Sequence, residues 1–296
     1  MVQQEIRDIH DIEILENINL EKFTTIRLAN RGTVIKVFTE AALTALIQKL
    51  LRDKTQYHLI GWGANQVLLN TENTLFIKLD FSYSRETFKA VQNEYDLPAS
   101  VPLNILTSHA TKFGLKGWEV FTGIPASLGG AIYMNAGTSL GEIGSLIKSV
   151  RILQKDGEIR IHHCTDQDFS YRKNHFVKEG EVIISAVLRH LGQDEDLKTQ
   201  IQEYLEMRKR TQPLKTKNCG SVFKNVSPQF RAGRTIDCIG LKEFGMENLK
   251  VSPLHANFVE NSGEASAKDF QNLVSCLKID MERYSGLKFE LEVKVY

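Results

Sequence analysis

Residues 123–137, with the sequence GIPASLGGAIYMNAG, constrain the fold of this chain more than any other segment. Four glycines, two of them adjacent, and one proline interrupt an otherwise apolar stretch. Glycine lets the backbone approach another group closely, and a helix beginning near Ser127 would present free N–H groups that attract an anion such as a pyrophosphate. Close packing of backbone against backbone would explain the same composition, so this segment alone leaves both interpretations open.

A second glycine-rich loop, Gly61-Trp62-Gly63-Ala64-Asn65, follows the apolar run YHLIG. Its spacing matches neither GxGxxG nor GxxxxGK[ST], so the dinucleotide fingerprint of a Rossmann fold and the P-loop are both absent. An ordinary turn after a strand would account for this loop by itself. Two glycine-rich loops in one domain, however, together favour a bound dinucleotide.

The pattern of apolar residues and turn signals predicts a mixed α and β fold. Thr39 is a suitable N-cap for a helix with an apolar stripe, and Gly114 is a suitable helix stop. Asp156-Gly157 lies between two β-like runs and predicts a hairpin. The predicted strands are 33–38, 57–61, 75–79, 149–154 and 158–164 (as the hairpin), 181–191, 255–261 and 288–295. The predicted helices are 39–53, 103–114, 194–211 and 265–284.

Length and charge narrow the class of protein. A chain of 296 residues is expected to form about two domains, with a boundary near 190–215. The 37 basic and 36 acidic residues give a net charge of +1, which argues against nucleic acid as a partner but allows a local basic pocket. No apolar run reaches about 18 residues and the N-terminus has no signal-peptide pattern, so we expect a cytoplasmic protein without a membrane partner.

The cysteines and histidines predict neither a disulfide framework nor a metal site. The four cysteines form no CxxC pair, and the eight histidines form no HExxH motif.

Three further motifs carry candidate chemistry. Tyr171-Arg172 could present a guanidinium to a carboxylate or phosphate, although a surface arginine is the ordinary explanation. Ser221 follows Gly220 near several lysines, outside any GxSxG motif, which suits a proton donor to a carbanion or enolate. Glu290 and Glu292 would share one face of a terminal strand, where simple solvation is the alternative.

These motifs, taken in order, resemble the UDP-N-acetylenolpyruvoylglucosamine reductase (MurB) family of bacterial cell-wall synthesis. The segments that carry the resemblance are GIPASLGGAIYMNAG, FSYR, CGSVFKN, GLK, VSPLHANFVENSGEAS and ELEV. No extra tyrosine-bearing loop separates the hairpin from residue 190, so the chain is similar to the shorter, type II form. The family's usual glycines and serine are replaced at Leu28-Ala29-Asn30, Trp62 and Ala64.

The resemblance implies an α+β flavoenzyme. Residues 1–190 would form a PCMH-type FAD-binding domain, related to vanillyl-alcohol oxidase, with subdomains at about 17–80 and 81–190. Residues 191–296 would form the C-terminal substrate domain. FAD would be bound noncovalently and reduced by NADPH, and its hydride would reduce the enolpyruvyl ether to the lactyl ether of UDP-N-acetylmuramate.

The resemblance also assigns roles to individual residues. Ser221 matches the proton donor to C2 of the substrate, with Lys224 nearby to help it release the proton. Arg172 and Glu292 match the pair that polarises the substrate carboxylate. The predicted substrate contacts are Tyr171, Lys224, Asn225, His255 and Asn257, and the predicted cofactor contacts are Gly61, Gly63, Ala64, Asn65, Gly123, Ile124, Pro125, Ser127, Gly129, Gly130, Asn135, Ala136 and Gly137.

Two other functions stay open at this level. One is an FAD-dependent oxidoreductase of the same fold with another substrate, against which the presence of Arg172, Ser221 and Glu292 together argues. The other is a flavin- or nucleotide-binding protein without catalytic activity. An absorbance spectrum with flavin bands that NADPH does not bleach would indicate this alternative. We expect a monomer whose partners are the UDP-sugar enolpyruvyl ether and NADPH.

Overall fold

The structure is a computed structural model that describes residues 4–69 and 71–296. The chain forms two compact units that interleave along the sequence. Unit 1 comprises Met1–Glu16, Val34–Gly61 and Leu75–Leu205, and unit 2 comprises Asn17–Thr33, Trp62–Thr74 and Glu206–Tyr296. This division differs from a single cut at residue 190, because two short N-terminal segments belong to the same unit as the C-terminal third.

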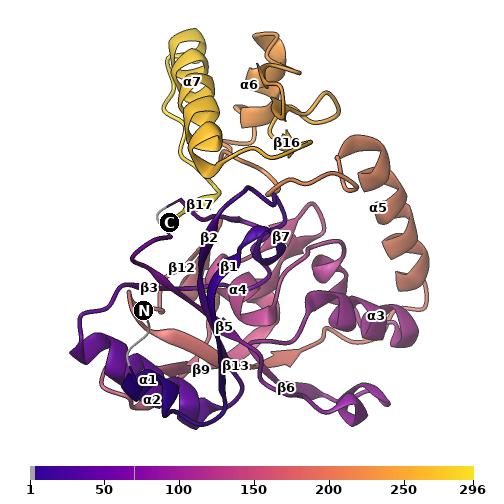
Figure 1. The fold of residues 1–296 in the computed structure, drawn as a ribbon. Helices are drawn as coiled ribbons and strands as arrows, with labels where there is room; N and C mark the ends of the chain where they lie inside the picture. The colour runs from indigo at the N-terminus through magenta and orange to yellow at the C-terminus, as the bar shows by residue number, and fades with distance from the viewer. Residues whose placement is uncertain (1–3, 70) are drawn as a thin grey trace. The chain divides into compact units, whose positions relative to one another are not determined.

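The first sheet has the strand order β1-β2-β5-β3 and is seen beside helix α2 in Figure 1. Its strands are β1 (Ile12–Asn19), β2 (Arg31–Val37), β5 (Leu75–Leu79) and β3 (Tyr57–Leu59), with α1 at Gln4–Arg7. The helix predicted over 39–53 is confirmed as α2 (Glu40–Arg52). The Thr39 side chain caps it by accepting a hydrogen bond from the Ala42 N–H. Its apolar stripe, Leu43, Leu46, Ile47 and Leu50, is buried in the core that this helix shares with the strands.

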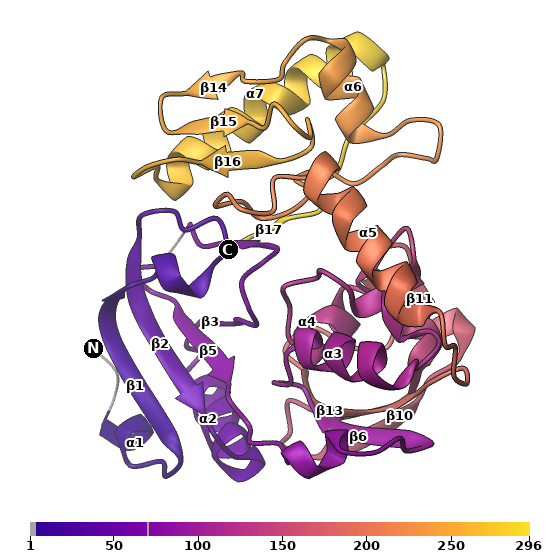
Figure 2. The same cartoon turned by 90° about the vertical axis from the view of Figure 1, so that its right-hand side faces the viewer.

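The second sheet, entirely in unit 1, has the order β10-β9-β13-β6. Figure 2 shows α3 and α4 lying over it. Strand β13 is buried on both faces: Ile183, Ala186 and Leu188 join the core under α3 and α4, while Val182 and Ile184 join the core under α2. The bounds are β10 (Ile159–His163), β9 (Ile147–Leu153), β13 (Val182–Arg189), β6 (Glu94–Pro98), α3 (Leu103–Phe113) and α4 (Leu128–Tyr133).

Local signals explain where these elements end. Gly114 ends α3 in a left-handed conformation, as predicted. Gly157, with φ +91°, forms the predicted turn between β9 and β10. The shorter elements of this unit are η2 (Arg85–Phe88), η3 (Trp118–Phe121), η4 (Ile143–Leu146), η5 (Asp166–Asp168), β7 (Gly137–Thr138), β8 (Gly141–Glu142), β11 (Phe169–Ser170) and β12 (Lys173–Asn174).

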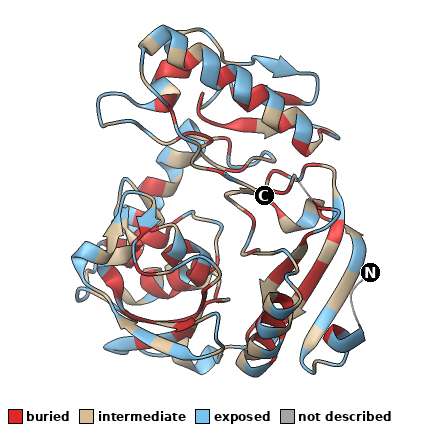
Figure 3. Cartoon of the chain, turned by 90° about the vertical axis from the view of Figure 1, so that its left-hand side faces the viewer, coloured by how far each residue is buried: buried red, intermediate tan, exposed pale blue. Residues whose placement is uncertain are grey.

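Unit 2 contains an antiparallel sheet, β14-β15-β16, and the long helix α7. One face of α7 is buried, as the red colour in Figure 3 shows. Its residues share a core with Val251 and Val259 of the sheet. The capping box of Ser266 and Asp269 begins α7, and Gly286 ends it. The bounds are β14 (Gly245–Met246), β15 (Leu249–Val251), β16 (Val259–Asn261), α6 (Ala232–Cys238), α7 (Ala267–Ser285) and η1 (Glu21–Phe23), with α5 (Leu197–Thr211) crossing from unit 1.

The two N-terminal segments complete the core of unit 2. Ile26, Leu28 and Val67 are buried among C-terminal residues, and the buried Asn261 side chain donates to the carbonyls of Ile26 and Arg27. Strand β4 (Gln66–Val67) pairs in parallel with β17 (Lys294–Val295). The predicted strand over 288–295 is therefore wrong for most of its length, because only its last two predicted residues form a strand.

No helix in the described part of the chain is long and apolar enough to cross a membrane.

Candidate active-site residues

The two glycine-rich loops meet in unit 1 at Gly61 and Ser127. A Cβ atom at Gly61 would lie 2.9 Å from the Ser127 hydroxyl oxygen, so a side chain there would fill the space that this hydroxyl faces. Ser127 precedes α4 but its side chain caps no helix amide, and it is 8% exposed. The absence of side chains at Gly61 and Gly130 therefore keeps space around a buried hydroxyl, which suits a phosphate oxygen of FAD.

The beginning of α4 offers fewer free amides than the sequence predicts. The N–H of Leu128 donates to the Val101 carbonyl at 2.8 Å, and the N–H of Gly129 donates to the Ala99 carbonyl at 2.8 Å. A Cβ at Gly129 would stand 2.7 Å from that of Ala99. Gly129 thus serves close backbone packing, the alternative explanation for this segment, rather than free amide presentation.

Lys78 is a residue of this loop cluster that the sequence analysis did not select. It lies in β5 and its Nζ donates to the Gly61 carbonyl at 2.8 Å. Burial lowers the pKa of Lys78 below its ordinary value. A lysine inside the apolar run LFIKL was the available signal, because a cation in such a strand needs a polar partner. The glycine-lined space, the hydroxyl and this cation together fit FAD.

The remainder of the first loop belongs to unit 2. Gly63 has φ +65°, and a Cβ there would stand 2.0 Å from the Phe23 carbonyl oxygen, so glycine is required. Asn65 donates from Nδ2 to the Glu292 carbonyl at 2.9 Å, and its own carbonyl accepts the Lys294 N–H. Asn65 therefore fixes the backbone of the segment that carries Glu292. Trp62 is 42% exposed.

Other predicted cofactor residues have mainly structural surroundings. Gly123 has φ +71°, and both Ile124 and Ala136 pack against the core of unit 1. Asn135 is 1% exposed, and its side chain hydrogen-bonds to Glu142, to the Ser170 carbonyl and to the Gly144 N–H. Gly137 accepts a hydrogen bond from Arg172 on its carbonyl. A direct contact of these residues with FAD stays a prediction, as it does for Ala64 and Pro125.

Arg172 lies at the tip of the β11–β12 hairpin in unit 1. Its Nη2 donates to the Gly137 carbonyl at 2.9 Å, and its guanidinium lies 5.0 Å from the centre of the Tyr171 ring. Tyr171 itself is 45% exposed. The guanidinium of Arg172 is thus in contact with the ring of Tyr171, the other residue of this predicted motif.

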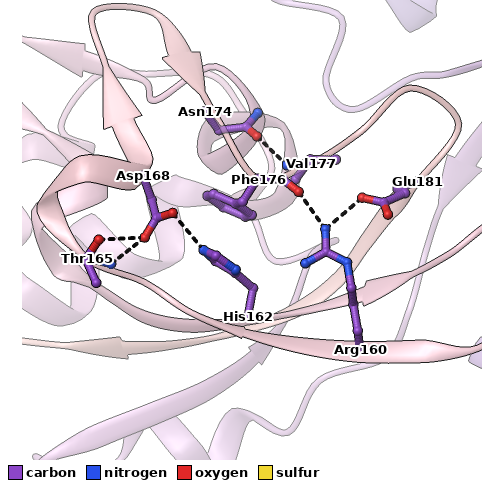
Figure 4. A network of polar contacts seen from close by, with 8 residues as sticks. All are labelled: Arg160, His162, Thr165, Asp168, Asn174, Phe176, Val177 and Glu181. Atoms are coloured by element: carbon purple, nitrogen blue, oxygen red, sulfur yellow. Dashed lines mark hydrogen bonds and ion pairs between the residues drawn. The ribbon is translucent and has the colours of Figure 1, made fainter.

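A polar network holds the base of this hairpin, as Figure 4 shows. Asp168 accepts hydrogen bonds from Thr165 and lies 2.9 Å from His162 Nε2, while the His162 ring stacks on Phe176 with centroids 4.4 Å apart. The partly buried Arg160 pairs with Glu181 at 2.8 Å. Burial opposes ionisation of Glu181, but the hydrogen bonds from Arg160 and from a backbone N–H outweigh it and lower the pKa of this carboxyl.

Ser221 and Glu292 lie on paired backbone segments of unit 2. The Glu292 N–H donates to the Val222 carbonyl at 2.8 Å, and the Lys224 N–H donates to the Glu290 carbonyl at 2.9 Å. Asn257 holds the other side, because its side chain accepts from the Phe223 N–H and donates to the Phe223 carbonyl. This pairing places the backbone of Ser221 next to that of Glu292, although neither lies in a regular strand.

The structure shows different surroundings for Cys219 and Glu290, the neighbours of Ser221 and Glu292 in sequence. In a regular strand Cys219 would share a face with Ser221, but Gly220 between them has φ +73° and breaks that alternation. Cys219 is 1% exposed, and burial raises the pKa of its thiol to about 12. Glu290 is exposed and forms an ion pair with Lys224 at 2.9 Å, so Lys224 is partly neutralised by a carboxylate.

The predicted substrate contacts differ in their surroundings. Asn225 is exposed, and its Oδ1 accepts the Ala232 N–H at the beginning of α6. Burial lowers the pKa of His255, whose ring packs edge-on against Phe258. Within residues 4–69 and 71–296, no group of three or more His, Cys, Asp or Glu side chains could hold a metal ion.

Comparisons with known proteins define the class of the chain. The family model described as "FAD binding domain" matches residues 32–162. The model described as "UDP-N-acetylenolpyruvoylglucosamine reductase, C-terminal domain" matches residues 212–296. The chain is therefore an FAD-dependent oxidoreductase with the predicted α+β fold, in which an FAD-binding domain is joined to a C-terminal reductase domain.

Individual relatives identify the family. The UDP-N-acetylenolpyruvoylglucosamine reductase of Lachnoclostridium phytofermentans is 33% identical, with 100% of this chain and 97% of the relative covered. That of Moorella thermoacetica is 31% identical, with 96% and 94% covered. The crystal structure of the enzyme from Thermus caldophilus has a TM-score of 0.79 and 30% identity, with 96% and 98% covered. The chain belongs to the UDP-N-acetylenolpyruvoylglucosamine reductase family.

Proposed function

We propose that this protein reduces UDP-N-acetylenolpyruvoylglucosamine to UDP-N-acetylmuramate, a step of peptidoglycan precursor synthesis, with NADPH as the electron donor. Family membership along the whole chain supports the reaction. The observation that carries the residue assignment is the pairing of the Ser221 and Glu292 segments in unit 2. FAD, when bound, takes a hydride from NADPH and delivers it to the substrate.

Ser221, Arg172 and Glu292 have distinct roles in this proposal. Addition of a hydride at C3 of the enolpyruvyl ether places negative charge on C2 and its carboxylate, and fixed donors aimed there lower the barrier. Arg172 binds the carboxylate through its planar guanidinium, which suits the geometry of two oxygens. Ser221 gives a proton to C2, and Glu292 stabilises the enol-like intermediate.

The remaining assignments complete the proposal. Residues 1–190 bind FAD, and residues 191–296 bind the substrate together with Tyr171 and Arg172. Tyr171, Lys224, Asn225 and His255 contact the UDP-sugar, whereas Asn257 acts through the backbone that it holds. The protein works as a cytoplasmic monomer.

Ser221→Ala tests the proton-donor role. Stopped-flow absorbance separates reduction of the flavin by NADPH from its reoxidation by UDP-N-acetylenolpyruvoylglucosamine. We expect an unchanged first step and a second step slower by about 10²–10⁴-fold, the usual contribution of a positioned proton donor. Ser275→Ala, on the exposed face of α7, is the matched control and should leave both steps unchanged.

Reoxidation of Ser221→Ala at the wild-type rate would refute the assignment to Ser221. Loss of both steps with loss of bound flavin would instead show a structural role. A wild-type enzyme that NADPH reduces but the substrate does not reoxidise would refute the proposed substrate.

A further inference from the structure

Arg172 occupies a backbone position that ordinarily selects glycine. Residues 171 and 172 form the two-residue connection between β11 and β12, and Arg172 has φ +57°. A left-handed residue in such a turn is usually glycine, asparagine or aspartate, because a Cβ is crowded there. Arginine in this conformation carries backbone strain that glycine would avoid.

The Glu142 carboxylate faces the Arg172 guanidinium. Glu142 Oε1 lies 3.9 Å from Arg172 Nη1, which is within range for charge attraction but too long for a hydrogen bond. The guanidinium is fixed from another side by its hydrogen bond to the Gly137 carbonyl. The side chain of Arg172 is 17% exposed and that of Glu142 is 38% exposed, so solvent screens this attraction mainly from the Glu142 side.

Asn135 fixes Glu142 in turn. Asn135 Nδ2 donates to Glu142 Oε2 at 2.7 Å and to the Ser170 carbonyl at 3.0 Å, and its Oδ1 accepts the Gly144 N–H at 3.0 Å. One buried side chain therefore ties the end of the glycine-rich segment, the strand β8 and the strand that leads into Arg172. Asn135 itself has φ +43°, a left-handed conformation that asparagine tolerates.

We propose that Glu142 is a positioning residue, which orients the Arg172 guanidinium toward the substrate carboxylate, and that Asn135 holds Glu142 in place. This inference rests on the proposed function of Arg172. Glu142 acts through charge at a distance, so it aligns the guanidinium without using a hydrogen bond to it. Its contact with Asn135 uses the other carboxylate oxygen, so one side chain joins the buried asparagine to the arginine.

Glu142→Gln removes the charge and leaves an amide oxygen that can still accept from Asn135. We expect normal flavin content and normal reduction by NADPH, with reoxidation by the UDP-sugar substrate slower by about tenfold and a raised KM. Glu40→Gln is the matched control, because Glu40 pairs with Arg151 elsewhere in unit 1. It should leave both steps unchanged.

A double-mutant cycle with Arg172→Lys separates this inference from the proposed function. Lysine lacks the planar guanidinium, so Glu142→Gln should have little further effect in the Arg172→Lys background. Equal effects of Glu142→Gln in both backgrounds would overturn the positioning role, as would wild-type reoxidation in Glu142→Gln. An unaffected Arg172→Lys would refute the role of Arg172 itself.

Glu142→Asp covers the case in which Glu142→Gln loses flavin or does not fold. It keeps the charge but shortens the side chain by one methylene. A selective defect in reoxidation, with normal flavin reduction, would support the inference. A wild-type rate in this variant would overturn it, because positioning depends on where the charge lies.

Discussion

Replacing Asn257 with alanine should destabilise unit 2 and loosen the Ser221 segment. The Asn257 side chain acts as one rung of a β-ladder: its Oδ1 accepts the Phe223 N–H at 3.0 Å, and its Nδ2 donates to the Phe223 carbonyl at 2.8 Å. Residues 290–292 bond to the backbone of Val222 and Lys224, the residues on either side. In the variant, both polar groups of Phe223 lose the partner that Asn257 supplied.

The magnitude follows from burial. Phe223 is 1% exposed and Asn257 is 4% exposed, so water reaches these groups poorly. A buried donor or acceptor left without a partner costs about 1–3 kcal/mol, which gives about 2–6 kcal/mol for the two together. Asn225→Ala is the matched control, since Asn225 is exposed and makes one hydrogen bond, to Ala232, in a setting where about 0.5–1.5 kcal/mol is expected.

Amide hydrogen exchange by NMR and urea denaturation measure the effect. A loss of about 1–3 kcal/mol at the Phe223 N–H corresponds to exchange about 5–150 times faster. The Val222 N–H bonds to the backbone carbonyl of Asn257, which alanine retains, so its exchange should change less. A change in unfolding free energy no greater than that of Asn225→Ala, with unchanged exchange at Phe223, would refute the reasoning.

Three further predictions concern other buried positions. Burial lowers the pKa of His109, so the unfolded chain binds a proton more readily, and stability should fall as pH decreases through about 6.5. The urea midpoint of His109→Phe should depend less on pH than that of wild type, because His58 and His255, whose pKa values burial also lowers, remain. The exposed His163→Phe should keep the full wild-type dependence. Gly129→Ala should lower the melting temperature by overpacking against Ala99, at a cost of about 1–3 kcal/mol, and a melting temperature equal to that of wild type would contradict the close approach. Cys219→Ala should leave flavin reoxidation unchanged, because the buried thiol has a pKa raised to about 12, and slower reoxidation at normal flavin content would contradict this.

Local sequence signals were sufficient for several helices. The apolar stripe and the cap at Thr39 predicted α2, Gly114 marked the end of α3, and the pattern over 265–284 predicted α7. These features depend on residues within a few turns of one another, so they are readable without the tertiary structure. The ordered motifs around residues 123–137 and 219–225 likewise indicated the family and its cofactor.

The surroundings of the site residues depended on contacts between distant segments. Gly220 reverses the backbone, so Cys219 is buried while Ser221 remains partly exposed beside the 290–292 segment. The amides at the beginning of α4 are used by carbonyls near residue 100, which no helix signal reveals. The link of Lys78 to the glycine-rich loop is visible only in the tertiary structure, where its amine donates a hydrogen bond to the Gly61 carbonyl.

The sequence by itself therefore determined the main helices, the fold class and the motifs that identify the family. The tertiary structure decided that residues 17–33 and 62–74 belong to the same unit as the C-terminal third. It also decided that Glu142 in β8 faces Arg172 at the tip of the β11–β12 hairpin. The physical reason is the range of the interactions. Helix propensity and capping act between near neighbours, whereas burial, backbone pairing and charge contacts join residues that lie far apart along the chain.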